Sequence, residues 1–356
     1  MKLFFCFFFA YISLFKISAE DQKQYFRLKI NNKESKVYFA SSSSNQIKKR
    51  IIVPQKMYKL FEIGGIQDTI LYSPSGITTD KKGNIYILDY IGKFAKKFSS
   101  DGKFIKQYGK PGKGPGELLY PAKIYLDEKD SVYIFDSSSN LLTAYFKNLK
   151  QFRTKSGSLP VEFLPFDNGT IIVLKSSLQS PKIFERYNIH GQLLNELDEI
   201  LDKKSIPNEF IFLGHLLKGK ILKISSSKFV HIPDYFNQMF FYKNDKLERV
   251  VSTLDKPTYP FFEMETSSNK FRMSFKDLDK YTVNINSFII DNDIYIVNKK
   301  EMKSEKLIVD IYSAIDGLYK HTLQIPFTES FHLIHMTKNR IYMITTDLKL
   351  KVYSYD

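Results

Sequence analysis

One pattern recurs six times along the 356-residue chain and restricts what it can fold into. Each time, a short polar turn precedes a five-residue run of apolar, mostly β-branched or aromatic residues. The runs begin at Ile85, Val132, Ile171, Ile221, Ile294 and Ile341. Turns such as DKKGN, residues 80–84, are typical of the connection between adjacent antiparallel strands. Repetition at this spacing predicts a series of equivalent small sheets.

The last repeat indicates how the series closes. It ends at Asp356 after its third strand, so its fourth strand is missing. The segment 48–65 precedes the first repeat, and its Lys56–Phe61 resembles the strand Lys103–Tyr108. We expect this N-terminal strand to complete the last sheet, because a closed ring has no open edge between its ends. The predicted fold class is all-β: a six-bladed β-propeller over residues 48–356, with four-stranded antiparallel blades.

Three segments resemble a known family. They are GKGPGEL with Pro121 (residues 112–121), GNIYILD (83–89) and SDGKF (100–104). They are similar to the signature segments of NHL-repeat propellers, over roughly residues 73–146. Where that family carries an Arg five residues after the Asp, this chain has Phe94 and Leu141, so the contacts of that Arg are not implied. By its fold and N-terminal signal, the chain also resembles exported six-bladed propellers of bacterial envelopes.

The first 19 residues read as a secretory signal. Lys2 precedes an apolar run from Leu3 to Phe15, and the segment ends in a small residue at Ala19. An uncleaved anchor remains an alternative, since Lys16 interrupts the pattern. The only cysteine, Cys6, lies inside this run, so the processed chain has no thiol. We expect a periplasmic, envelope-associated or secreted protein that does not span the membrane after cleavage.

Residues 20–47 are predicted to form a basic segment outside the ring. Within it, residues 25–40 favour a hairpin, and Ser41–Ser44 a short flexible link. The whole chain carries a formal charge of +15. That excess suggests nucleic acid, an acidic polysaccharide or an anionic membrane as partners, but outside the N-terminal segment it is spread as single lysines. Nucleic acid is not expected for an exported protein.

In a propeller blade, the loops between the second and third strands share one face with the links between blades. The sequence predicts that this face carries the long loops, 109–121, 175–182, 197–210, 225–238, 254–281 and 298–306, and that it binds the ligand. Aromatic rings mixed with lysines suit a protein, peptide or glycan. The predicted contacts are Tyr90, Lys93, Lys110, Lys113, Tyr120, Lys175, Phe229, Tyr235, Phe236 and Tyr259. Phe261 and Phe262 are expected to fold the longest insertion back onto the blades.

Catalytic signals are weak. When the repeats are aligned, His215 and His335 occupy the position equivalent to Thr79, on the predicted innermost strands. A zinc ion bound by these histidines is therefore an alternative, and the resemblance supports it because some NHL-type lyases use channel-facing histidines with zinc. A zinc site normally needs three protein ligands, however, and no third histidine occupies this position. Asp80, Asp89, Asp127 and Asp136 recur at fixed places, which indicates turn and strand-end hydrogen bonding. Calcium is the other possible metal, but no set of acidic and amide ligands for it can be assembled from the sequence.

The sequence therefore predicts an exported, non-enzymatic binding or assembly module of the bacterial cell envelope, without a cofactor. The first alternative is a metal-dependent hydrolase or lyase acting in the channel. The second is a nucleic-acid-binding propeller, for which steeply salt-dependent binding would be required.

Overall fold

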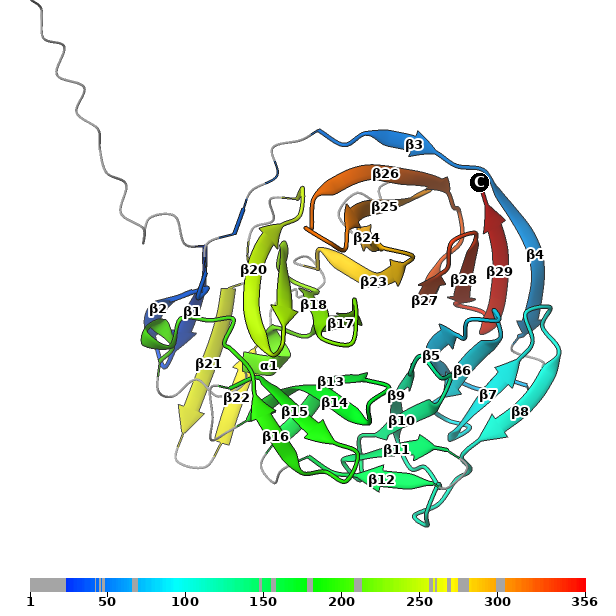
Figure 1. Cartoon of the computed structure of the whole chain (residues 1–356), viewed down its shortest axis with the longest axis horizontal. Helices are drawn as coiled ribbons and strands as arrows, with labels where there is room; N and C mark the ends of the chain where they lie inside the picture. The colour runs from blue at the N-terminus through cyan, green and yellow to red at the C-terminus, as the bar shows by residue number, and fades with distance from the viewer. Residues whose placement is uncertain are drawn as a thin grey trace, which may run out of the picture.

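The computed structural model describes residues 24–41, 43–44, 46, 49–65, 70–146, 149–154, 158–177, 182–207, 213–255, 259, 261–267, 270–274, 282–298 and 305–356. The predicted signal, residues 1–19 with Cys6, lies outside them. Small antiparallel sheets follow one another around a ring (Figure 1), and the predicted six-bladed propeller is confirmed.

Blades 1 to 3 each contain four strands, ordered along the chain from the channel to the rim. Blade 1 contains β5 (Pro74–Thr79), β6 (Ile85–Asp89), β7 (Phe94–Phe98) and β8 (Phe104–Tyr108). Blade 2 contains β9 (Pro121–Leu126), β10 (Val132–Asp136), β11 (Leu141–Tyr145) and β12 (Lys150–Phe152). Blade 3 contains β13 (Ser158–Pro165), β14 (Thr170–Ser177), β15 (Phe184–Asn188) and β16 (Leu193–Glu196).

Blade 4 follows a short 3₁₀ helix η2 (Lys203–Ser205) and helix α1 (Leu213–Leu216), and contains β17 (Gly219–Lys223), β18 (Lys228–Pro233), β19 (Gln238–Lys243) and β20 (Lys246–Ser252). Blade 5 contains β23 (Asn284–Ile290), β24 (Asp293–Asn298), β25 (Lys306–Ser313) and β26 (Tyr319–Pro326), with β3 (Ile52–Pro54) added outside β26. Blade 6 contains β27 (Phe331–Met336), β28 (Arg340–Thr345) and β29 (Lys349–Tyr355), and its fourth strand is β4 (Met57–Gly64).

Ring closure follows the prediction. Strand β4 pairs antiparallel with β29, with Leu350 opposite Ile63 and Val352 opposite Phe61. The innermost strands also contact one another in sequence around the circle, and β27 of blade 6 contacts β5 of blade 1. The first and last blades are therefore joined by both hydrogen bonds and packing.

Apolar cores between adjacent blades hold the ring together. The second strand is fully buried in blades 1 and 2, because a neighbouring blade covers each of its faces. Ile85 and Ile87 of blade 1, for example, pack with Tyr342 and Ile344 of blade 6. Full burial of one such side chain contributes about 1.5–3 kcal/mol, so these continuous interfaces suffice without a disulfide.

In blade 4 the structure differs from the predicted repeat by one strand. The run that starts at Ile221 belongs to β17, the innermost strand, and the second strand is β18, with the sequence KFVHIP. The predicted long loop 225–238 is wrong for the same reason, since it contains β18. A histidine and a proline inside β18 disguise it as a loop, whereas β17 carries the β-branched and leucine residues expected of a buried strand.

A satellite sheet lies beside blades 3 and 4 (Figure 1). It contains the hairpin β1 (Tyr25–Ile30) and β2 (Lys33–Tyr38), in the segment where the sequence predicts one, and the hairpin β21 (Phe261–Ser267) and β22 (Lys270–Ser274) from the insertion between blades 4 and 5. Strands β1 and β21 pair in parallel. The rings of Phe26, Phe236 and Phe262 pack together and join this sheet to blade 4.

The chain then crosses the rim of three blades before it reaches the first. We call the described residues between 44 and 64 the N-terminal strap. Ser44 exchanges backbone hydrogen bonds with Val250 and Ser252 of blade 4, β3 pairs in parallel with β26 of blade 5, and β4 completes blade 6. Figure 1 shows β3 and β4, in blue, outside the orange and red strands.

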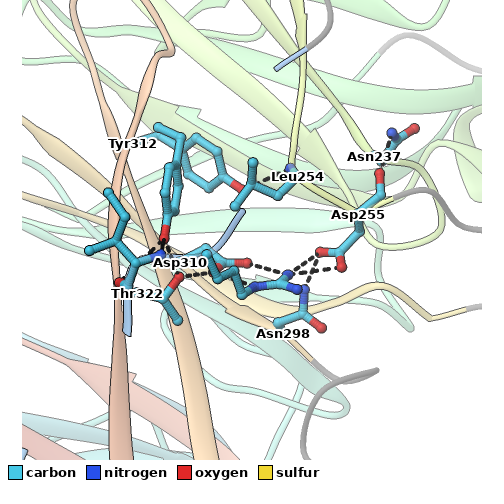
Figure 2. Close-up of polar contacts among 10 residues, drawn as sticks. Asn237, Leu254, Asp255, Asn298, Asp310, Tyr312 and Thr322 are labelled. Atoms are coloured by element: carbon cyan, nitrogen blue, oxygen red, sulfur yellow. Dashed lines mark hydrogen bonds and ion pairs between the residues drawn. The ribbon is translucent and has the colours of Figure 1, made fainter. Parts of the chain in front are cut away.

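Arg50 links the strap to the segment after blade 4 and to blade 5 through hydrogen bonds with Asp255 and Asp310. Figure 2 shows the carboxylates of Asp255 and Asp310 in this cluster of polar contacts, with Asn298 and Thr322 nearby. The guanidinium of Arg50 donates to both carboxylate oxygens of Asp255, at 2.8 and 2.9 Å, and to both of Asp310, at 2.9 and 2.8 Å. Thr322 Oγ1 also donates to Asp310, at 2.6 Å. Burial raises the pKa of Asp255, although Arg50 opposes this effect. The negative charges of Asp255 and Asp310, both buried, are therefore balanced by the single positive charge of Arg50.

Candidate functional site

The innermost strands share a local irregularity near the face that carries the links between blades. In blades 1, 2, 3, 5 and 6 the pairing of the first two strands skips one residue of the innermost strand, which is a β-bulge. The skipped residues are Ser75, Ala122, Val161, Ile285 and His332. In blade 4 the pairing of β17 with β18 is regular, and Gly219 lies where its backbone approaches Ile232 closely. Bulges re-aim the side chains that follow them, here those at the channel mouth.

The residue that follows the skipped residue of each bulge, together with Lys220 of blade 4, occupies an equivalent position in all six blades. We call these six positions the channel ring. Each member pairs with the equivalent residue of the second strand in its blade. The members are Gly76, Lys123, Glu162, Lys220, Asn286 and Leu333. All six line one cavity of about 490 Å³. Blades 2, 3 and 4 contribute the charged members, and blades 5, 6 and 1 the uncharged ones. The channel is therefore electrostatically one-sided.

Glu162 is the buried acid of the channel ring. Its Oε2 accepts from Lys123 Nζ at 2.8 Å, and its Oε1 lies 3.8 Å from Lys220 Nζ. Burial alone would raise the pKa of Glu162, but the charges of Lys123 and Lys220 outweigh it and lower the pKa. Glu162 is thus held ionised between two lysines of neighbouring blades.

A second cavity, of about 680 Å³, opens at the mouth beside blades 4, 5 and 6. It shares Lys218, Asp234 and Ile285 with the channel cavity. Its wall combines aromatic and charged residues, among them Tyr235, Phe327, Phe331, Glu305, Lys306 and Glu329. Because these residues come from loops between second and third strands and from links between blades, the mouth lies on the face that the long loops predicted.

Asp234 lies where the two cavities meet. Its backbone N–H donates to Lys218 O at 2.8 Å, and its carbonyl accepts from Val283 N at 2.8 Å and Asn284 N at 3.1 Å, so its position is fixed. Burial raises the pKa of Asp234 to about 6, although Lys218, whose Nζ lies 4.0 Å from Oδ2, opposes the shift. A carboxyl group that titrates near neutral pH inside a cavity is a frequent mark of a functional site.

The ten contacts predicted from the sequence separate into three groups. Tyr90, Lys93 and Tyr120 meet on blades 1 and 2: the two rings lie 5.8 Å apart, and Lys93 Nζ is 4.6 Å from the centre of the Tyr120 ring. Lys110 and Lys113 are exposed on the neighbouring link, where Lys110 pairs with Glu117 at 3.3 Å. Four of these residues are exposed and Lys93 is partly exposed, and none of the five is among the residues that line the two cavities.

The other five predicted contacts require correction or relocation. Lys175, Phe229 and Phe236 are buried, and so they are wrong as surface contacts. Lys175 forms an ion pair with buried Glu185, and the two Phe rings belong to the core beneath the satellite sheet. Tyr235 is also buried but forms part of the mouth wall. Tyr259 is half-buried, and its hydroxyl donates to Asn237 Oδ1 at 2.6 Å.

The two histidines considered for a metal have different settings. His335 is on β27, and its Nε2 lies 2.9 Å from Thr79 Oγ1. The prediction that His215 lies on an innermost strand is wrong. His215 belongs to helix α1, and its Nδ1 lies 2.6 Å from Ser176 Oγ. Within the described ranges, no three His, Cys, Asp or Glu residues are grouped so that they could hold a metal ion.

The repeated aspartates form local hydrogen bonds, as predicted. Asp89 accepts from the backbone N–H groups of Tyr72, Ser73 and Gly92. Asp136 makes the equivalent contacts in blade 2, and Asp80 and Asp127 each cap a turn and accept from a buried tyrosine hydroxyl. Asp89 and Asp136 therefore hold the links that precede their blades, and Asp80 and Asp127 hold the turns between first and second strands.

Sequence reasoning missed the charged channel residues Lys123, Glu162, Lys218, Lys220 and Asp234. A usable signal was present, because Lys123 and Glu162 are charges inside predicted innermost strands at equivalent offsets from the following buried run. Lys220 did not align with them, since the fourth repeat was displaced by one strand.

Solved structures give the same architecture. A Bacteroides fragilis protein inferred to be exported matches with a TM-score of 0.53 at 10% identity, covering 86% of this chain and 99% of that one. A Bacteroides vulgatus protein of the DUF4221 family matches with a TM-score of 0.51 at 10% identity, over 86% and 98%. A virginiamycin B lyase from Staphylococcus aureus matches with a TM-score of 0.49 at 14% identity, over 84% and 99%. These likenesses concern the fold alone.

No curated protein matches the sequence significantly. Across the described residues, none of the helices has the length and apolar character needed to cross a membrane. One family does match, over residues 66–279, and it is described as a 6-bladed beta-propeller, DUF5128. Since that match covers more than half of a chain whose described part closes into six blades, the protein belongs to the DUF5128 family of six-bladed β-propellers.

Proposed function

We propose that the chain is an exported, non-enzymatic binding module of the bacterial cell envelope, built on NHL-like repeats. Its ligand, a protein, peptide or glycan, engages the face that carries the links between blades. Export is supported by Lys2, the apolar run from Leu3 to Phe15 and Ala19. The Bacteroides fragilis protein inferred to be exported shares the fold.

The observation that carries the proposal is the mouth cavity of about 680 Å³, which opens on the linker face and shares residues with the channel cavity. A recess of this size with an aromatic wall and a few fixed charged groups is typical of a binding site. The exposed Tyr90–Lys93–Tyr120 cluster lies on loops of the same face and would extend the contact area of a larger ligand. Cofactors are not required by this role.

The experiment compares three forms of the processed chain on a cell-envelope extract. Ser330 is exposed at the mouth, and Ser330→Trp would fill part of the cavity without changing a charge. Lys81→Ala/Lys82→Ala changes two exposed residues of a turn on the opposite face and serves as the control. We expect one envelope component to bind the wild type and the control in a saturable manner, and to bind Ser330→Trp at least tenfold more weakly.

The opposite pattern, in which the Lys81/Lys82 variant loses the component and Ser330→Trp keeps it, would refute the choice of face. Sequencing the N-terminus of the native protein tests export. An unprocessed chain would contradict the proposed address and reopen nucleic acid as a partner, which a salt titration of binding would then examine.

A further inference from the structure

We propose that the joined cavities bind a small amphipathic organic anion, whose carboxylate or phosphate group lies between Lys218 and Lys220 and whose apolar part rests on the aromatic wall of the mouth. This inference rests on the proposed function and names the ligand class for that site. Its basis is the distribution of charge and of unused hydrogen-bond donors around the channel.

The channel cavity has more cationic than anionic side chains. Lys123, Lys218 and Lys220 face two carboxylates, Glu162 and Asp234. At the mouth, Glu329 already accepts from Lys351 Nζ and from Tyr353 Oη, the latter at 2.9 Å, and is neutralised there. An added anion therefore balances the channel, whereas an added cation would increase its surplus of positive charge.

The three lysines differ in whether their ammonium groups already donate hydrogen bonds to a carboxylate. Lys123 donates to Glu162 at 2.8 Å. Lys220 lies 3.8 Å from Glu162 and Lys218 lies 4.0 Å from Asp234, which are distances of charge attraction but not of hydrogen bonding. In the part of the chain that the structure describes, neither ammonium group has a hydrogen-bond acceptor. Each carries three donors, so an oxyanion between them would gain charge-assisted hydrogen bonds.

The surroundings of these donors indicate an organic ligand. Lys218 Nζ lies 5.1 Å from the centre of the Tyr235 ring, which is part of the mouth wall. Phe327, Phe331 and Ile285 line the same cavity. A ligand that places its charge at Lys218 would therefore bring its attached carbon atoms against aromatic and aliphatic side chains. Each of the two cavities, of about 680 and 490 Å³, has the size of a small-molecule site.

Isothermal titration calorimetry at low ionic strength tests this with four small probes that each carry one phenyl ring and differ in their polar group. They are 3-phenylpropionate, phenyl phosphate, neutral 3-phenylpropanamide and cationic 3-phenylpropylamine. We expect one or both anions to bind at least tenfold more tightly than the amide and the amine. The two anions distinguish a carboxylate ligand from a phosphate ligand.

Variants locate the interaction. Lys220→Gln and, separately, Lys218→Gln are expected to weaken anion binding about tenfold or more, the size of one lost charge-assisted hydrogen bond. Lys220→Arg, which keeps the charge, should retain most of it. Lys81→Gln, on the opposite face, should have no effect. Thermal unfolding of each variant separates loss of the fold from loss of the site.

Three results would overturn the inference: equal binding of anions and amide, preferential binding of the amine, or anion affinity unchanged in both Lys218→Gln and Lys220→Gln. If the amide binds wild type and not Ser330→Trp, the mouth is a binding site and only the anion assignment fails. If none of the four probes binds, the anion assignment also fails, and the envelope-extract comparison then decides the proposed function separately.

Discussion

Arg50→Met should show how strongly the N-terminal strap holds the ring. The substitution keeps much of the aliphatic volume but removes the only cation hydrogen-bonded to Asp255 and Asp310 among the described residues. The side chains of the three residues are 19%, 5% and 1% exposed, so solvent cannot replace the guanidinium well. Loss of one partner from a buried ion pair costs about 3–5 kcal/mol. We expect the lower value, since Asn298 and Thr322 still donate to the two carboxylates.

The assay is urea unfolding followed by far-ultraviolet circular dichroism, because the chain has no tryptophan. The midpoint should fall at pH 7, and the deficit should shrink at pH 5, where the uncompensated carboxylates can take up protons. Arg50→Lys keeps the charge without the planar fork and should lie between Met and wild type. Arg153→Met, at an exposed position, is the control.

The triple variant Arg50→Met/Asp255→Asn/Asp310→Asn removes all three charges and should recover most of the loss, because it leaves no buried charge without a partner. An Arg50→Met protein as stable as the wild type, or a triple variant no more stable than Arg50→Met, would refute the reasoning.

Three further changes test other parts of the structure. Gly219→Ala would place its Cβ 2.1 Å from Ile232 O and should cost about 1–3 kcal/mol by urea unfolding, whereas Gly114→Ala, which meets only the side chain of Glu117, should be nearly neutral. Phe26→Ala removes a ring packed against Phe39, Phe236 and Phe262. It should lower the local free energy of unfolding by about 3–5 kcal/mol, measured as faster amide hydrogen exchange in β1 and β2. The control Tyr25→Ala should leave the exchange rates unchanged. The pKa of Asp234 in the folded protein is raised to about 6, so its ionised form opposes folding above that pH. The wild type should therefore gain stability relative to Asp234→Asn as the pH falls from 7 to 4. Parallel curves of unfolding free energy against pH for the two proteins would contradict the shift.

The fold was accessible from the sequence where each repeat combines a turn signal with a buried run. Asp80 and Ile85 in blade 1, and Asp127 and Val132 in blade 2, encode their hairpins locally. The completing strand β4 was also predictable, because the last repeat lacks an outer strand. The satellite sheet was not, since its parallel pairing joins β1 to β21, more than two hundred residues away. No local signal fixes a contact of that range.

The site was less accessible for a related reason. Its charged residues belong to separate innermost strands and come together only when the ring closes, so none of them has a motif in its own neighbourhood. Aromatic residues chosen by composition were misleading in blade 4, where Phe229 and Phe236 cover the core instead of a ligand. The predicted face was nonetheless the one that carries the mouth, because strand alternation dictates on which side each loop emerges.

The pairing of β4 with β29 also limits the order in which this protein can mature. One partner strand ends at Gly64 and the other at Tyr355, so the earlier strand must wait until all the blades between them have been synthesised. Until then, the rim of blade 6 and the seam with blade 1 stay open, and a chain truncated by a single strand leaves both incomplete. Closure of the ring is therefore a late event that depends on β29, and quality control can act on any product that ends before this strand.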